Sequence, residues 1–150
     1  MIGNWCFTIG GKERDDGICR ITNCPNLRQL QIGNFSFWDF KSFELSNVNS
    51  LQSIKFGYSC FEDVREFVLD GLEGLGRVKI DDGCFRNRFA DERRDGVCRI
   101  TNCPNLRQLE IGKKSFEDFK SFELSNLNSI QFIDFGHHCF NYADFSLKGE

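Results

Sequence analysis

The sequence lacks the features that mark a membrane protein, a secreted precursor or a nucleic-acid-binding protein. No apolar run approaches the roughly 18 residues that a membrane-spanning helix needs. The first residues lack a basic segment followed by an apolar one, so no secretory signal is predicted. The formal net charge of -3 comes from interspersed acidic and basic residues and does not favour nucleic acid or an anionic membrane as a partner.

Aromatic residues with a polar group are also scarce. There are two Tyr and two Trp against 17 Phe, and this bias predicts buried packing more than ligand contact. The only histidines, His137 and His138, stand beside Cys139, which makes a metal or acid–base site the alternative reading. Other repeats have Tyr58 and Ser59 at their place, which favours an ordinary turn. No metal site and no cofactor are predicted.

An internal repeat dominates the sequence. Residues 18–30 (ICRITNCPNLRQL) and 97–109 (VCRITNCPNLRQL) are identical at 12 of 13 positions and lie 79 residues apart. Inside this long unit, Leu27, Leu51 and Leu75 recur every 24 residues, and Leu106 follows 31 residues later. The seven extra residues fall in one loop. A period in this range is typical of a solenoid, whose successive coils stack on one another.

Like side chains recur at each step and form columns. A coil cannot bury its apolar face alone, so neighbouring coils stack and the core becomes continuous. The most regular column contains only phenylalanine: Phe7, Phe37, Phe61, Phe85, Phe116 and Phe140. Two further columns are Leu30, Ile54, Val78, Leu109 and Ile133, and Ile21, Leu45, Leu69, Ile100, Leu124 and Leu147.

Apolar and polar residues alternate twice in each coil, as in half-buried strands. The pattern predicts a repeat solenoid, mainly β, with two short parallel strands per 24-residue coil and little or no helix. Gly after the first strand predicts a sharp turn, and Asn after the second strand predicts an inward side chain that bonds turn backbone. Residues 1–150 are predicted to form a single domain of about six coils, a fragment of a longer repeat array.

The segment NCPNLRQLQIG at 23–33, repeated with Glu110 at 102–112, resembles leucine-rich repeats, in particular the cysteine-containing and BspA-like subclasses. The resemblance covers nearly the whole chain. It implies protein–protein recognition, often on a concave sheet, and no catalysis. The sequence departs from the family at the ninth position of the pattern, normally Asn, which is filled by Phe35, Ser59, Gly83, Lys114 and His138.

Each of the eight cysteines occupies a position that an apolar or small residue fills in other coils. Cys6, Cys60, Cys84 and Cys139, for example, alternate with Ser36 and Ser115. This pattern predicts buried free thiols; a disulfide between adjacent coils and a metal site are the alternatives. Free thiols and the missing signal favour a cytoplasmic, reducing compartment.

Two surfaces are candidates for binding. The outward face of the first strands supplies Arg28, Gln31, Lys55, Arg77, Lys79, Arg107, Glu110 and Phe132. Charged loops at 8–17 and 86–96 are predicted to project from one edge, the second with Arg88 and Arg93, although a solvated loop of mixed charge is the alternative. On the second strands, Arg20 and Glu44, and Arg99 and Glu123, are predicted to pair as a supporting ladder.

The sequence therefore predicts a non-catalytic scaffold that binds a protein partner through the first-strand face and the projecting loops. The alternative is a structural or adhesive segment that self-associates end to end, because uncapped coils expose apolar ends and strand edges. A carbohydrate-active β-solenoid enzyme is the least favoured reading. Glu110 and Asp134 are the only carboxylates of the first-strand face, and they do not recur with a basic partner.

Overall fold

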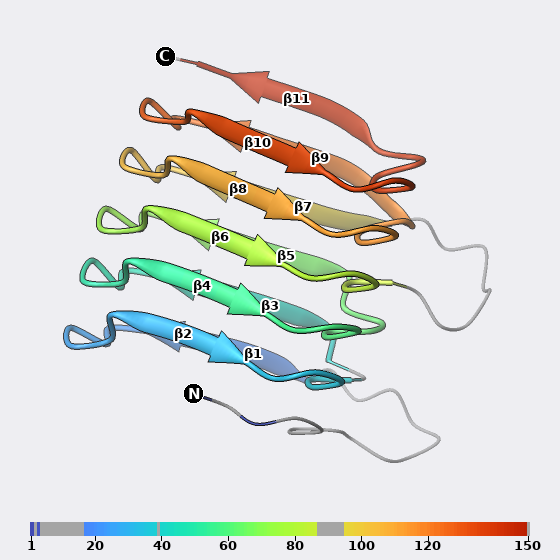
Figure 1. Cartoon of the computed structure of the whole chain (residues 1–150), viewed down its shortest axis with the longest axis horizontal. Helices are drawn as coiled ribbons and strands as arrows, with labels where there is room; N and C mark the ends of the chain where they lie inside the picture. Colours follow the sequence, from blue (N-terminus) through green and yellow to red (C-terminus); the bar gives the residue numbers. More distant parts are fainter. Residues whose placement is uncertain (2, 4–16, 39, 87–94, 150) are drawn as a thin grey trace.

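The computed structural model describes residues 1, 3, 17–38, 40–86 and 95–149, and this part of the chain contains strands, turns and no helix (Figure 1). The strands are β1 (Ile18–Thr22), β2 (Gln29–Ile32), β3 (Ser42–Ser46), β4 (Ser53–Phe56), β5 (Glu66–Asp70), β6 (Arg77–Ile80), β7 (Gly96–Thr101), β8 (Gln108–Ile111), β9 (Phe119–Ser125), β10 (Phe132–Phe135) and β11 (Asp144–Lys148). In these described residues, no helix is present that could cross a membrane.

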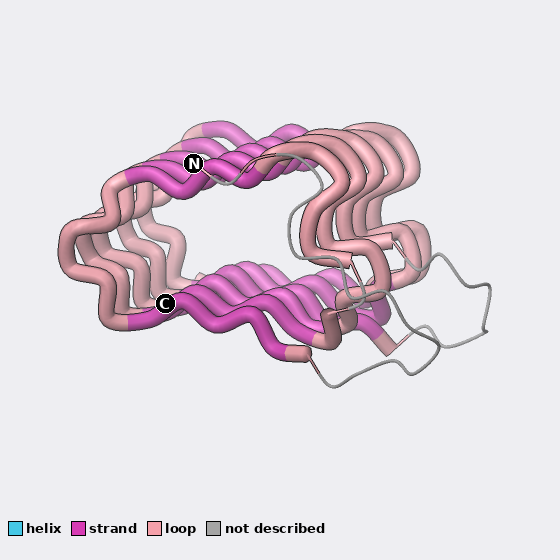
Figure 2. The backbone as a smooth tube through the Cα atoms, turned by 90° about the horizontal axis from the view of Figure 1, so that it is seen from below, coloured by secondary structure: helices cyan, strands magenta, loops and turns pink. Residues whose placement is uncertain are grey.

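The strands form two parallel sheets on opposite sides of a flattened coil (Figure 2). The six-stranded sheet has the order β1-β3-β5-β7-β9-β11, and the five-stranded sheet has the order β10-β8-β6-β4-β2. Each strand therefore pairs with the strand one coil away, as the 24-residue period predicts. The solenoid prediction is confirmed for about five coils. The preceding coil, inferred from Cys6 and Phe7, lies outside the described residues.

The phenylalanine column is a continuous stack of buried rings. Ring centroids lie 4.9 Å apart between Phe37 and Phe61, 4.9 Å between Phe61 and Phe85, 4.5 Å between Phe85 and Phe116, and 5.0 Å between Phe116 and Phe140, with planes within 16° of parallel. All five have a left-handed backbone, with φ between 52° and 60°. Such a backbone costs a non-glycine residue about 1–2 kcal/mol, which the burial of a whole aromatic ring offsets.

Close contact between coils requires glycine after the first strand at Gly57 and Gly112, whereas Asp81 occupies the equivalent position after β6. A Cβ on Gly57 would collide with Asn34 Oδ1 and lie 2.9 Å from Asn34 N, and one on Gly112 would lie 2.5 Å from Asp82 N. The left-handed residue comes two positions later, at Phe35, Ser59, Gly83, Lys114 and His138. These are the positions at which the sequence departs from the leucine-rich-repeat pattern, and the sharp turn is made there.

The asparagines that follow the second strand do not point inward, so that prediction was wrong. Asn23, Asn47, Asn102 and Asn126 have φ between 52° and 55°, a left-handed backbone that asparagine tolerates well. Asn126 Nδ2 donates to Asn102 Oδ1 at 2.7 Å, and Asn102 Nδ2 donates to Asp70 Oδ1 at 2.8 Å. Asparagine therefore adopts the left-handed backbone of the turn, and its side chain forms hydrogen bonds between neighbouring coils.

The column that alternates Cys with Ser is a row of hydrogen-bond donors. Cys60 Sγ donates to Gly33 O at 2.9 Å, Cys84 Sγ to Gly57 O at 3.0 Å and Cys139 Sγ to Gly112 O at 2.9 Å. Ser36 and Ser115 donate to the equivalent carbonyls of Gly3 and Asp81, each at 3.2 Å. Small size and donor capacity together explain why only Cys and Ser occur here, because each satisfies a carbonyl of the preceding coil.

The stacked rings generate a stability prediction. We expect Phe85→Ala to lower the free energy of unfolding by about 3–5 kcal/mol, because it removes a wholly buried ring from the middle of the column. Tyr58→Ala, at an exposed turn of a neighbouring coil, should change it by less than about 0.5 kcal/mol. Urea unfolding followed by circular dichroism measures both; equal losses would contradict the stack.

The close approach of the coils generates a second prediction. We expect Gly57→Ala to destabilise the protein by about 1–3 kcal/mol, because the added methyl group would have to displace backbone of the preceding coil. Gly76→Ala is the matched control, since its nearest neighbour would be Gln52 O at an ordinary 3.7 Å. Thermal melting of the two variants tests the argument, which fails if Gly57→Ala melts with the wild type.

Candidate functional site

The outward residues of β2, β4, β6, β8 and β10, with the exposed residues just before these strands, are called the five-stranded face below. All the surface candidates predicted from the first strands lie on it or directly before its strands. Three in-register pairs bring them together: Gln31 with Lys55, Lys55 with Lys79, and Lys79 with Glu110. The loop candidates Arg88 and Arg93 lie outside the described residues.

One carboxylate on this face serves two cations. Glu110 Oε1 accepts from Arg77 Nη2 at 2.8 Å, and Glu110 Oε2 lies 3.4 Å from Lys79 Nζ. The hydrogen bond from Arg77, followed by the charge of Lys79, lowers the pKa of the Glu110 carboxyl. Glu110 is therefore a fixed anion at neutral pH, tied to the cationic side chains of β6.

Positive charge remains in excess toward β2 and β4. Lys55 is exposed and stands directly opposite Lys79, a like-charge pairing that destabilises a sheet. Arg28 is exposed just before β2. The structure gives neither Lys55 nor Arg28 an ion pair among the described residues. This part of the face is therefore positively charged, although the net charge of the chain is negative.

Lys55, Arg77 and Lys79 border an open hollow of about 370 Å³. Its lining combines amide and hydroxyl groups with the cations and two aliphatic side chains: Gln29, Leu30, Gln31, Ser53, Ile54, Lys55, Arg77 and Lys79. The volume lies in the range of small ligand sites. Gln29 and Ser53 were not among the predicted site residues, although the strand alternation places both outward.

Glu110, on the five-stranded face, is poorly suited to act as a general acid. Glu110 and Asp134 lie opposite each other on β8 and β10, so two carboxylates stand side by side on this face. A general acid needs a raised pKa, whereas the partners of Glu110 lower its pKa. Arg77 reaches Glu110 diagonally from β6, a contact that the repeat pattern does not predict. The arrangement can hold an anion or donate hydrogen bonds.

The opposite, six-stranded face has its charges largely paired. Arg20 Nε lies 2.7 Å from Glu44 Oε2, and Arg99 lies 3.4 Å from Glu66 and 4.0 Å from Glu123. The predicted Arg–Glu ladder is therefore confirmed. Exposed pairs of this kind contribute at most about 1 kcal/mol each, so they support the sheet modestly. They leave little charge for a partner.

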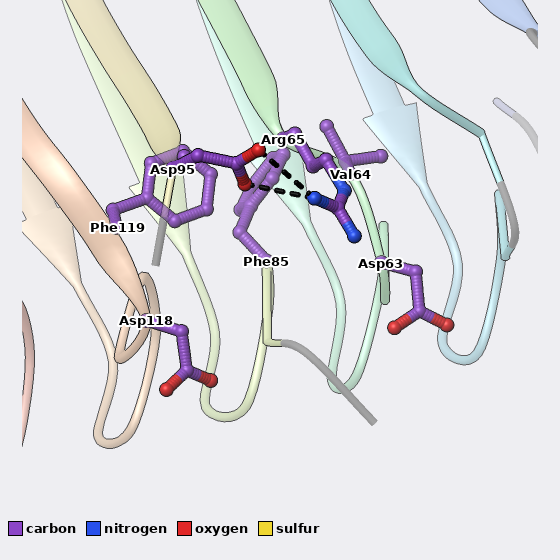
Figure 3. Close-up of a pocket in the computed structure, with 8 residues that line it drawn as sticks. Asp63, Val64, Arg65, Phe85, Asp95, Asp118 and Phe119 are labelled. Carbon is purple, nitrogen blue, oxygen red and sulfur yellow. Dashed lines mark hydrogen bonds and ion pairs between the residues drawn. The ribbon is translucent and has the colours of Figure 1, made fainter. Parts of the chain in front are cut away.

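A second hollow lies where the 86–96 loop rejoins the solenoid (Figure 3). Arg65 Nη1 contacts both carboxylate oxygens of Asp95, at 2.9 and 3.0 Å, beside Phe85 and Phe119. The cavity measures about 20 Å³, which is room for about one water molecule. The Arg65–Asp95 ion pair therefore holds Asp95 against the solenoid, and the cavity beside it is too small for a ligand.

Three of the buried or half-buried cysteines, Cys19, Cys98 and Cys103, are poor nucleophiles. Burial raises the pKa of the Cys98 thiol well above its ordinary value and the pKa values of Cys19 and Cys103 to about 11. Thiols of this kind stay protonated near neutral pH, and the thiolate is the reactive form. The seven cysteines that the structure describes are free. His137 and His138 are exposed at a turn, and the described residues hold no cluster of potential metal ligands around them.

Comparisons with known proteins give the chain no family. The fold and the five-stranded face therefore rest on the geometry above, and the leucine-rich-repeat resemblance stays a prediction. No protein-family model, no curated protein and no solved structure matches this chain.

Proposed function

We propose that this protein is a non-catalytic protein-interaction scaffold that binds a protein partner through the five-stranded face. The observation that supports this most is the open hollow over β2, β4 and β6, which is bordered by cations that exceed the available carboxylates. A surplus of one charge around a polar hollow suits recognition of a complementary surface.

The distribution of sequence variation along the stack also supports a scaffold. Inward positions repeat the same residue types, as in Leu30, Ile54, Val78 and Leu109, because stacking fixes them. The outward positions beside them change in charge along the stack, from Gln31 through Lys55 and Lys79 to Glu110. A parallel sheet with regular register therefore presents a non-repeating set of side chains on a fixed frame, which is how solenoids build extended binding surfaces.

Photo-crosslinking from each face tests this function. We expect a benzoylphenylalanine residue placed at Ser53, on the five-stranded face, to give a discrete adduct with a second polypeptide in extracts of the source cells. The same residue at Val68, on the outer face of β5, is the matched control and should give none. Equal adducts from both positions, or none from Ser53 and from a second position at Gln29, would contradict the proposal.

Self-association is a second candidate function, favoured by one observation. The last described coil exposes apolar side chains, with exposed fractions of 50% for Phe132, 41% for Ile133, 48% for Phe145 and 67% for Leu147. β10 and β11 are also the edge strands of their sheets in the described part of the chain, and edge strands offer unpaired backbone groups.

Sedimentation velocity over a hundredfold range of protein concentration tests self-association. If these strands join copies, we expect the wild type to sediment faster as concentration rises. Leu147→Lys should then suppress the shift, because it places a charge at the contact, and the exposed Tyr142→Ser should preserve it. A single monomeric boundary at all concentrations would exclude this second function.

A further inference from the structure

We propose that the five-stranded face over β2, β4 and β6 binds a short, extended acidic segment of a partner protein. The inference rests on the proposed function and names the chemistry of the partner. It follows from the charges, the polar groups and the limits of this surface.

Three cations line the hollow on this part of the face, Lys55, Arg77 and Lys79, and Arg28 lies exposed just before β2. One carboxylate, Glu110, contacts both cations on β6, Arg77 and Lys79. Lys55 and Arg28 have no carboxylate within ion-pair distance in the described part of the chain. The exposed fractions of the Arg77 and Lys79 side chains are 53% and 41%, so both can also reach an incoming group. Carboxylates are the complement of such a set, and an Arg guanidinium can hold one by two parallel hydrogen bonds.

The opposed lysines, Lys55 and Lys79, mark where the acidic segment would bind. Lys55 and Lys79 are held in register on neighbouring strands, about 4.8 Å apart across the sheet. Their repulsion destabilises the free protein, and an anion placed between them would relieve it. Alternate side chains of an extended peptide lie about 6.6 Å apart. The flexible lysine side chains can accommodate the difference between this spacing and the distance of about 4.8 Å between neighbouring strands.

The hollow also offers partners for a peptide backbone. Gln29, Gln31 and Ser53 line it, and their side chains supply both donors and acceptors. Leu30 and Ile54 contribute aliphatic atoms to the same lining. A segment with carboxylates among small polar residues would therefore meet groups for its side chains and for its main chain.

A long polyanion fits this surface less well. Single-stranded nucleic acid is commonly held by aromatic side chains on which bases stack, and no aromatic residue lines the hollow. Glu110 and Asp134 lie farther along the face, on β8 and β10, and would repel phosphates that extended there. The net charge of -3 opposes dense negative charge at longer range. A short segment that spans only β2 to β6 does not extend over the carboxylates on β8 and β10, and it carries less charge to be repelled by the chain.

Fluorescence anisotropy with a synthetic probe tests the inference. The probe is a fluorescein-labelled peptide of four Glu-Ser repeats, and its neutral analogue has four Gln-Ser repeats. We expect the Glu probe to bind in low salt, to weaken as salt rises and to bind at least tenfold more tightly than the Gln analogue. Lys55→Glu combined with Lys79→Glu should reduce Glu-probe affinity at least tenfold.

The matched control carries the same change of charge on the opposite face. Lys120→Glu combined with Lys148→Glu should leave the affinity within about twofold. Glu110→Gln should strengthen binding by about two- to fivefold, because it frees Arg77 and Lys79 from their competing carboxylate. If the Lys→Glu pair does not fold, as judged by circular dichroism, Lys55→Gln with Lys79→Gln replaces it with the same expected direction.

Three outcomes would overturn the inference: equal binding of the Glu and Gln probes, equal losses in the two charge-reversed variants, or tighter binding of a labelled thymidine octanucleotide than of the Glu probe. The crosslinking experiment separates this failure from failure of the proposed function. A protein adduct from Ser53 without Glu-probe binding would refute the acidic segment alone, whereas absence of both would refute the scaffold as well.

Discussion

The stacking of each coil on the one before it is the interaction on which the rest of the structure depends. Backbone hydrogen bonds between parallel strands and the stacked rings of Phe37, Phe61, Phe85, Phe116 and Phe140 act across the same interface. The rings stack even though each of these residues has a left-handed backbone. A coil removed from its neighbours would keep the backbone strain and lose the burial, so its conformation is stable only inside the stack.

The same constraint divides the residues into two groups. Inward positions and the close turns are fixed by contact with the adjacent coil, as at Gly57 and Cys84. Outward positions of the sheets are free to differ, and the chain uses them differently on its two faces. The six-stranded face alternates charges that pair, whereas the five-stranded face sets Lys55 against Lys79, an arrangement that weakens the sheet and suits an anionic partner.

Much of the fold could be predicted from the sequence, because the repeat places equivalent residues at equivalent positions. Columns such as Leu30, Ile54 and Val78 follow directly from the period. Features that depend on the neighbouring coil could not be predicted. The distance of Gly57 from Asn34 and the thiol hydrogen bond of Cys84 arise only when coils meet. In the candidate site, alternation placed Lys55 and Lys79 outward, but the diagonal contact from Arg77 to Glu110 needs three-dimensional register.

Solution NMR on protein with labelled phenylalanine rings can detect the ring stack itself. We expect nuclear Overhauser effects between the rings of Phe61 and Phe85 and between those of Phe85 and Phe116, whose centroids lie 4.9 and 4.5 Å apart. Phe61 and Phe116, which are separated by the ring of Phe85, should show a much weaker effect or none. Contacts of Phe85 with neither neighbour in a folded sample would contradict the stacked solenoid and the proposed binding face that depends on it.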